Sequence, residues 1–121
     1  DAVLLTHLHS DHITDLNDLV TTRWILTPEA TPTIIYGPLG TQKVVDGMMA
    51  MLTPDQKYRH DHHADLRSGP GLQVEVHEVQ PGDEFKIGEA HVIVGRTDHR
   101  PVTPTIGFRI EAEGKSVVLA N

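Results

Sequence analysis

Residues 6–12 read Thr-His-Leu-His-Ser-Asp-His and follow directly on the apolar run Ala-Val-Leu-Leu at residues 2–5. Such a short apolar run predicts a buried strand. A strand that ends in a tight loop can turn the three histidines and the aspartate of this heptad toward one pocket. Imidazole and carboxylate groups are ligands that suit zinc, so the heptad indicates a metal site.

The heptad offers more ligands than one catalytic zinc ion requires. Such an ion keeps three protein ligands and one open position, whereas the heptad supplies His7, His9, Asp11 and His12. Two metal ions that share a bridging water would use all of them. The alternative is chance proximity, because the chain contains nine histidines. The fixed register of the ligands after a strand favours the metal site.

The composition fits one small cytoplasmic domain. The chain has 121 residues, enough for a single core, and 38% of them are hydrophobic. It has no cysteine, so every metal ligand must offer nitrogen or oxygen. No apolar run approaches the roughly 18 residues of a membrane span, and no signal peptide is visible. These features predict a cytoplasmic protein without a membrane partner.

The charge argues against generic nucleic-acid binding. The formal net charge is −7 with neutral histidines, and such binding depends on Lys and Arg side chains that neutralise phosphates. An RNA substrate would therefore be recognised by a local basic patch and by the metals. Bound zinc would offset part of the negative charge at the site.

The hydrophobic periodicity predicts strands that alternate with helices, followed by a run of strands. Helices are expected at 12–22, 41–52 and 54–66. Five apolar residues should form the buried face of the first helix: Ile13, Leu16, Leu19, Val20 and Trp24. Strands are expected at 2–5, 33–36, 72–79, 84–87, 90–94, 105–111 and 115–120. This order indicates an α/β layered domain in which helices cover sheets.

A second group of polar residues, at 96–101, also follows an apolar strand. Alone, His99 would be read as a solvated histidine. Together with His7 and His9 it would complete a three-histidine zinc site.

The two groups together resemble a known superfamily. The heptad at 6–12 is identified as the signature of the metallo-β-lactamase fold. His99, followed by Gly-Phe-Arg at 107–109, resembles the next motif of the ribonuclease Z-like branch in its actinobacterial form, and the Tyr-Gly-Pro-Leu-Gly turn at 36–40 is similar to a turn of the same branch. The resemblance implies a partial metallo-β-lactamase-like αββα sandwich. Residues 1–121 would be a fragment of one such domain, truncated at both ends, without its N-terminal strands and C-terminal metal motifs.

The resemblance also implies a role for each ligand. Two zinc ions in the intact site would be held by His7, His9 and His99 at the first position and by Asp11 and His12 at the second. Asp11 is in addition the candidate catalytic residue that handles the proton of the attacking water. Thr6 and Asp98 are candidate partners that would fix the tautomers of the histidines.

Four further residues are candidate substrate contacts. Arg96 and Arg100 flank His99 and could bind phosphate. His62 and His63 lie in the polar run at 59–65, which we interpret first as a partly exposed segment and second as a substrate contact.

The resemblance implies a zinc-dependent phosphodiesterase that cuts the 3′ end of tRNA precursors with a metal-activated water. It would be a homodimer when intact and inactive as this fragment alone. The alternative is an arylsulfatase-like, small-ester or cyclic phosphodiester hydrolase of the same fold. The RNA-gripping arm, which some tRNA-processing members insert after the Gly-aromatic-Arg strand, is absent between Arg109 and Ser116.

Other classes fit the sequence less well. The segment at 99–109 argues against a glyoxalase II-type thioesterase. A flavodiiron oxidoreductase favours glutamate where this chain has His9. A non-catalytic binding module of the same fold is the hypothesis from a different class, and the intact heptad argues against it.

Overall fold

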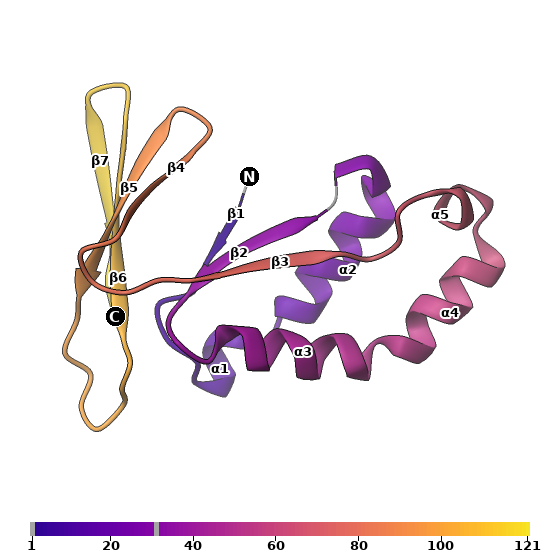
Figure 1. The fold of residues 1–121 in the computed structure, drawn as a ribbon, viewed down its shortest axis with the longest axis horizontal. Helices are drawn as coiled ribbons and strands as arrows, with labels where there is room; N and C mark the ends of the chain where they lie inside the picture. Colours follow the sequence, from indigo (N-terminus) through magenta and orange to yellow (C-terminus); the bar gives the residue numbers. More distant parts are fainter. Residues whose placement is uncertain (1, 31) are drawn as a thin grey trace.

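The computed structural model describes residues 2–30 and 32–121 and contains two sheets beside a layer of helices (Figure 1). The helices are α1 (Ser10–Ile13), α2 (Leu16–Leu26), α3 (Thr41–Met51), α4 (Thr53–His62) and α5 (Ala64–Ser68), with a 3₁₀ turn η1 (Pro28–Ala30). The strands are β1 (Ala2–Leu4), β2 (Thr33–Gly37), β3 (Val74–Glu78), β4 (Glu84–Ile87), β5 (Ala90–Arg96), β6 (Ile106–Ala112) and β7 (Lys115–Leu119). None of the described helices is long and apolar enough to cross a membrane.

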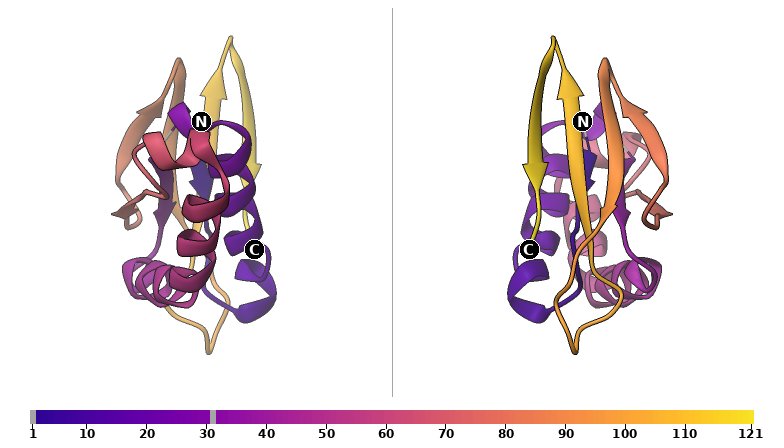
Figure 2. Two further views of the ribbon diagram at one scale, coloured as in Figure 1. Left: turned by 90° about the vertical axis from the view of Figure 1, so that its right-hand side faces the viewer. Right: turned by 90° about the vertical axis from the view of Figure 1, so that its left-hand side faces the viewer.

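The layers follow the order of the strands in the sequence. Strands β1, β2 and β3 form a parallel sheet, and β4 to β7 form an antiparallel sheet with neighbouring strands paired in chain order. Helices α2, α3 and α4 lie on one side of the parallel sheet, and the antiparallel sheet lies on its other side (Figure 1). No described helix lies in front of the antiparallel sheet (Figure 2, right). The expected partial αββα sandwich is confirmed, with both sheets and one helical layer.

Apolar contacts hold the two sheets together. The ring of Tyr36 on β2 stacks on that of Phe85 on β4, with 3.9 Å between the ring centroids. Leu4 on β1 packs against the buried cluster of the antiparallel sheet, where Val92 and Phe108 are almost inaccessible to solvent. The sheets therefore share one interior.

A second cluster lies between the parallel sheet and the helices. Val20 and Trp24 of α2 pack there with Ile35 of β2, and all three are buried. Burying each such side chain stabilises the fold by about 1.5–3 kcal/mol. The predicted buried face of the first helix is confirmed for Leu16, Val20 and Trp24 but is wrong for Leu19, whose surface is 44% exposed.

The strand predictions match the structure closely, whereas two predicted helices are each divided. The helix expected at 12–22 is α1 and α2, because Asp15 has non-helical backbone angles (φ −93°, ψ 10°) and begins the second helix. The hydroxyl of Thr14 donates to the carbonyl of Ser10 (2.6 Å), a local bond that closes the first short helix. The helix expected at 54–66 breaks at His63, whose backbone is extended.

The turn at 37–41 positions the region where the site lies. Gly37 ends β2, and a Cβ atom there would clash with the side chain of Thr41 and approach that of Leu5. The carboxylate of Glu78, at the end of β3, accepts hydrogen bonds from the backbone N–H groups of Gly40 (2.8 Å) and Gln42 (3.0 Å). These bonds fix the start of α3 beside the carboxyl ends of the parallel strands, the edge where α/β sheets bind ligands.

Candidate metal centre

The heptad forms the loop that leaves β1 and leads into α1. Leu5 is anchored by its N–H bond to the carbonyl of Tyr36 (2.8 Å), so the loop starts at a fixed point. His7 then turns into the interior and is only 1% exposed, whereas His9 is open to solvent. Nε2 of His7 lies 3.2 Å from Nδ1 of His9.

His99 reaches the same point from the loop between β5 and β6. This loop is closed at its base by the Thr97 hydroxyl, which donates to the hydroxyl of Thr105 (2.9 Å), and by a β-bridge between His99 and Val102. The N–H of Ile106 donates to the carbonyl of Thr6 (2.9 Å). That bond ties the His99 loop of the antiparallel sheet directly to the heptad loop of the parallel sheet.

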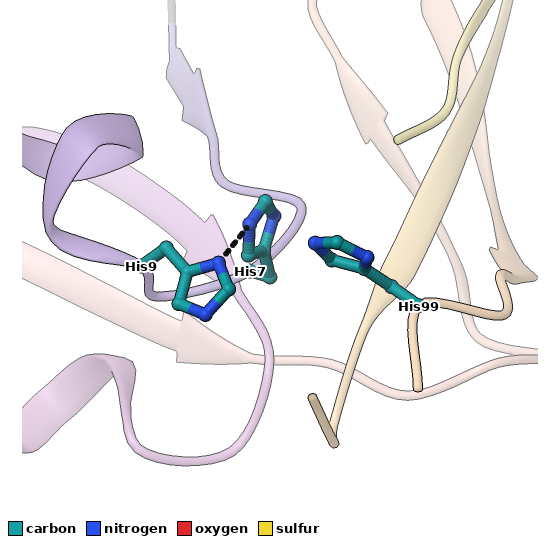
Figure 3. A group of neighbouring side chains, drawn as sticks. All are labelled: His7, His9 and His99. Atoms are coloured by element: carbon teal, nitrogen blue, oxygen red, sulfur yellow. Dashed lines mark hydrogen bonds between the residues drawn. The ribbon is translucent and has the colours of Figure 1, made fainter. Parts of the chain in front are cut away.

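The three imidazoles lie close enough to share one metal ion. One ring nitrogen from each of His7, His9 and His99 lies within 4.8 Å of the others, and the rings are turned toward one another (Figure 3). With Zn–N distances of about 2.0–2.1 Å, two nitrogens of a tetrahedral site lie about 3.3 Å apart. The distance between Nε2 of His7 and Nδ1 of His9 is 3.2 Å, close to this value. The donor set therefore fits a site with three nitrogen ligands and one open position.

His12 lies beside this cluster, and Asp11 lies at its edge. The ring centroids of His12 and His7 are 4.2 Å apart. The carboxylate of Asp11 lies 3.6 Å from Nε2 of His12, and its side chain is 80% exposed. Among the residues that the structure describes, the group able to hold one metal is His7, His9 and His99. The roles of Asp11 and His12 at a second metal remain predictions.

Two other side chains contact His7 at its second ring nitrogen. The hydroxyl of Thr6 lies 3.2 Å from Nδ1 of His7, as expected for a partner that fixes the tautomer. The amide nitrogen of Asn121 lies 3.4 Å from the same atom and 3.3 Å from Nδ1 of His12. No local pattern in the sequence marks Asn121 as a partner. Asp98, the other expected partner, instead holds Arg100.

Comparison with known proteins identifies the family. Residues 1–120 match the family model of the beta-lactamase superfamily domain. The chain belongs to this family. Among solved structures, the metallo-beta-lactamase fold protein YhfI from Bacillus subtilis superposes with a TM-score of 0.59 and 23% identity, over 98% of this chain and 39% of that chain. This likeness supports the fold alone.

Curated members of the beta-lactamase superfamily are much closer in sequence. The chain is 54% identical over 121 residues to Ribonuclease Z of Mycolicibacterium gilvum and 50% identical over 121 residues to Ribonuclease Z of Mycobacterium bovis. In both cases the match covers 98% of this chain and 42% of the relative, so the chain spans less than half the length of these relatives. The predicted resemblance to ribonuclease Z is confirmed. Family membership and the histidine cluster together indicate metal binding.

The environment of His7 favours the neutral imidazole that a metal requires. Burial is the largest effect that lowers the pKa of His7 below its ordinary value of 6.5, followed by repulsion from His12, His9 and His99. The nearby carboxylate of Asp11 acts in the opposite direction and raises the pKa of His7. A metal ion competes with protons for a histidine nitrogen, and the lowered pKa reduces this competition near neutral pH.

The lowered pKa of His7 predicts that the metal-free chain loses stability as the pH falls below 6.5. In that range the unfolded chain binds a proton at this residue while the folded chain does not, so protonation favours unfolding. Above 6.5 both states are neutral at His7 and this effect vanishes. We expect thermal unfolding between pH 5 and pH 8 to show a steeper decline toward acid for the natural chain than for His7→Asn. Equal slopes would contradict the prediction.

The four predicted substrate contacts fall into two regions of this beta-lactamase superfamily domain. Arg96 and Arg100 line a pocket of about 700 Å³ together with His99. His62 ends α4 and His63 separates it from α5, both are exposed, and this end of the helical layer lies across the molecule from the β5–β6 loop (Figure 1). Their role as substrate contacts stays a prediction, and the structure favours the interpretation as an exposed segment.

Proposed function

We propose that the full-length protein, meaning the polypeptide of its relatives' length that carries this sequence, is a zinc-dependent, ribonuclease Z-like phosphodiesterase. Its substrate would be a tRNA precursor, cut at the 3′ end by a metal-activated water. The observation that carries the proposal is the cluster of three histidines, in which one ring nitrogen from each lies within 4.8 Å of the others. This cluster occurs in a chain that is 54% identical to a protein named Ribonuclease Z.

Two zinc ions would occupy the intact site. His7, His9 and His99 would hold the first, and Asp11 and His12 would contribute to the second. When bound, zinc lowers the pKa of a water molecule and stabilises charge on a phosphoryl oxygen. The chain's own part is to present neutral, fixed imidazoles. The buried position of His7 supports this role.

Asp11 would accept a proton from the attacking water. Its carboxylate is 80% exposed and lies 3.6 Å from His12, so a water molecule can approach it. A carboxylate in such a position is suited to general base catalysis.

The alternative function is hydrolysis of a smaller ester, such as an aryl sulfate or a cyclic phosphodiester. The turn between β6 and β7 favours it, because Ala112 pairs with Lys115 across a tight hairpin with Glu113 and Gly114 at positive φ. No RNA-gripping arm projects from this place in the described residues. For the intact ribonuclease Z-like enzyme we also propose a cytoplasmic location and a homodimeric state.

Substrate competition tests the proposal. The zinc-loaded full-length protein would be offered a 3′-extended precursor tRNA, bis(p-nitrophenyl) phosphate and p-nitrophenyl sulfate, with mature tRNA and EDTA-treated protein as controls. We expect position-specific cleavage of the precursor and no cleavage of mature tRNA. Turnover of the small esters alone would favour the alternative function. Full activity in the EDTA-treated protein would contradict metal dependence.

A further inference from the structure

The pocket beside His99 is lined by both apolar and charged side chains. It measures about 700 Å³ and is formed by the β5–β6 loop, the segment after β3 and the turn that precedes α3. His99 belongs both to this pocket and to the histidine cluster. A group bound in the pocket would therefore lie next to the histidine cluster.

The apolar side chains of the pocket come from distant parts of the chain. Leu39 comes from the turn before α3, Val79 from the end of β3, and Val102 and Pro104 from the β5–β6 loop. Leu39 is 73% exposed, so its side chain is accessible to a ligand in the pocket. These side chains offer a surface on which a flat ring could lie.

Arg96 provides a positive charge in this pocket. It ends β5, is exposed, and has no ion pair or hydrogen-bonded side-chain partner among residues 2–30 and 32–121. Arg100 also lines the pocket, but its guanidinium is held by both carboxylate oxygens of Asp98 (2.9 and 2.7 Å). The Arg100 guanidinium in turn keeps the pKa of Asp98 below its usual range. Asp98 thus accepts from two of the five N–H donors of Arg100 and balances its charge, whereas the Arg96 guanidinium keeps all of its donors for a ligand.

An unpaired guanidinium next to an apolar wall suits a group that is both charged and flat. Arginine binds phosphate oxygens through two parallel N–H bonds. The chain as a whole carries a net charge of −7. The unpaired positive charge of Arg96 is therefore opposite in sign to the charge of the chain. Phosphate joined to a ring is the chemistry of a nucleotide.

We propose that this pocket is a nucleotide subsite: Arg96 binds the phosphate that flanks the scissile phosphodiester, and the wall around Leu39 contacts the base between the two phosphates. The inference rests on the proposed function and names the residues of this chain that would hold the nucleotide beside the cleavage site. Arg96 is thus a substrate-binding residue that sets specificity.

The test compares two matched RNA oligonucleotides. One has an ordinary phosphate next to the cleavage site, and the other has an uncharged methylphosphonate there. The zinc-loaded full-length protein, Arg96→Ala and the control Arg109→Ala would be assayed for KM, kcat and zinc content. Arg109 is an exposed arginine outside this pocket, where it pairs with Glu111. Binding of uncleavable versions, with the scissile bond blocked, would be measured by fluorescence anisotropy.

We expect Arg96→Ala to raise KM for the charged oligonucleotide roughly 10- to 100-fold, as for loss of a charge-assisted bond. Its KM for the methylphosphonate, its kcat and its zinc content should stay within about twofold of the natural protein. Arg109→Ala should behave like the natural protein. Leu39→Ala should weaken binding of the natural oligonucleotide but not that of one lacking the base.

Two results would overturn the subsite. One is an equal rise in KM for both oligonucleotides in Arg96→Ala. The other is equal binding of the charged oligonucleotide and the methylphosphonate by the natural protein. RNA cleavage that is indifferent to Arg96 would reject the subsite and keep the proposed function. Arg96-dependent binding without RNA cleavage would keep the subsite and reject that function.

Discussion

Replacing His7 with alanine in the full-length protein is expected to remove the first zinc ion and lower turnover about 1000-fold. His7 lies at the centre of the cluster: its Nε2 is 3.2 Å from His9, and its ring centroid is 5.0 Å from that of His99. The metal supplies several kcal/mol of transition-state stabilisation, and about 4 kcal/mol corresponds to a thousandfold change in rate. Zinc content by elemental analysis and kcat with a phosphodiester substrate measure the two effects.

A histidine outside the cluster provides the matched control. His91 lies on β5, where its ring nitrogens face the carboxylates of Glu84 (2.9 Å) and Glu111 (3.9 Å). His91→Ala removes the same side chain from a partly exposed position and should leave zinc content and kcat unchanged. If His7→Ala retained its zinc while His91→Ala lost it, the proposed metal centre would be wrong.

The sequence predicts the elements of this fold well because their signals are local. Alternation of apolar residues and the glycines at 88 and 114 mark the two hairpins that the structure contains. The helix break at Asp15 is not predicted because the apolar spacing continues across it, whereas the backbone of Asp15 leaves the helical region. Periodicity records burial and does not record the backbone angles of a single residue.

The site is predicted only in part, because its pieces meet through tertiary contacts. The heptad is visible in the sequence as one run, but nothing local says that His99 approaches His7. That association depends on pairing of β5 with β6 and on the bond from Ile106 to Thr6. The position of His99 after an apolar strand suggests it in the sequence, and the family resemblance supports it. The pocket that joins Leu39 to Arg96 has no sequence signature at all. Long-range packing creates it.

Substitution of Asp11 should lower turnover while the first zinc ion stays bound. In the full-length protein we expect Asp11→Ala to lower kcat by about 10²- to 10⁴-fold, the usual contribution of general acid–base catalysis. Zinc at the first position should persist, because Asp11 lies outside the group of His7, His9 and His99. Asp11→Asn keeps the shape of the side chain but cannot accept a proton, so it should lose nearly as much activity.

The control for Asp11 is a carboxylate of similar exposure nearby. Asp18 on α2 lines the same shallow hollow as Asp11 and His12, is exposed, and has no role in the proposed chemistry. Asp18→Ala changes the local charge by the same amount and should leave kcat within about twofold of the natural protein, since exposed charges interact weakly through water. Near-normal turnover in Asp11→Ala would exclude Asp11 as the base. An equal loss in Asp18→Ala would mean that the charge of this surface, rather than a proton acceptor at Asp11, controls the rate.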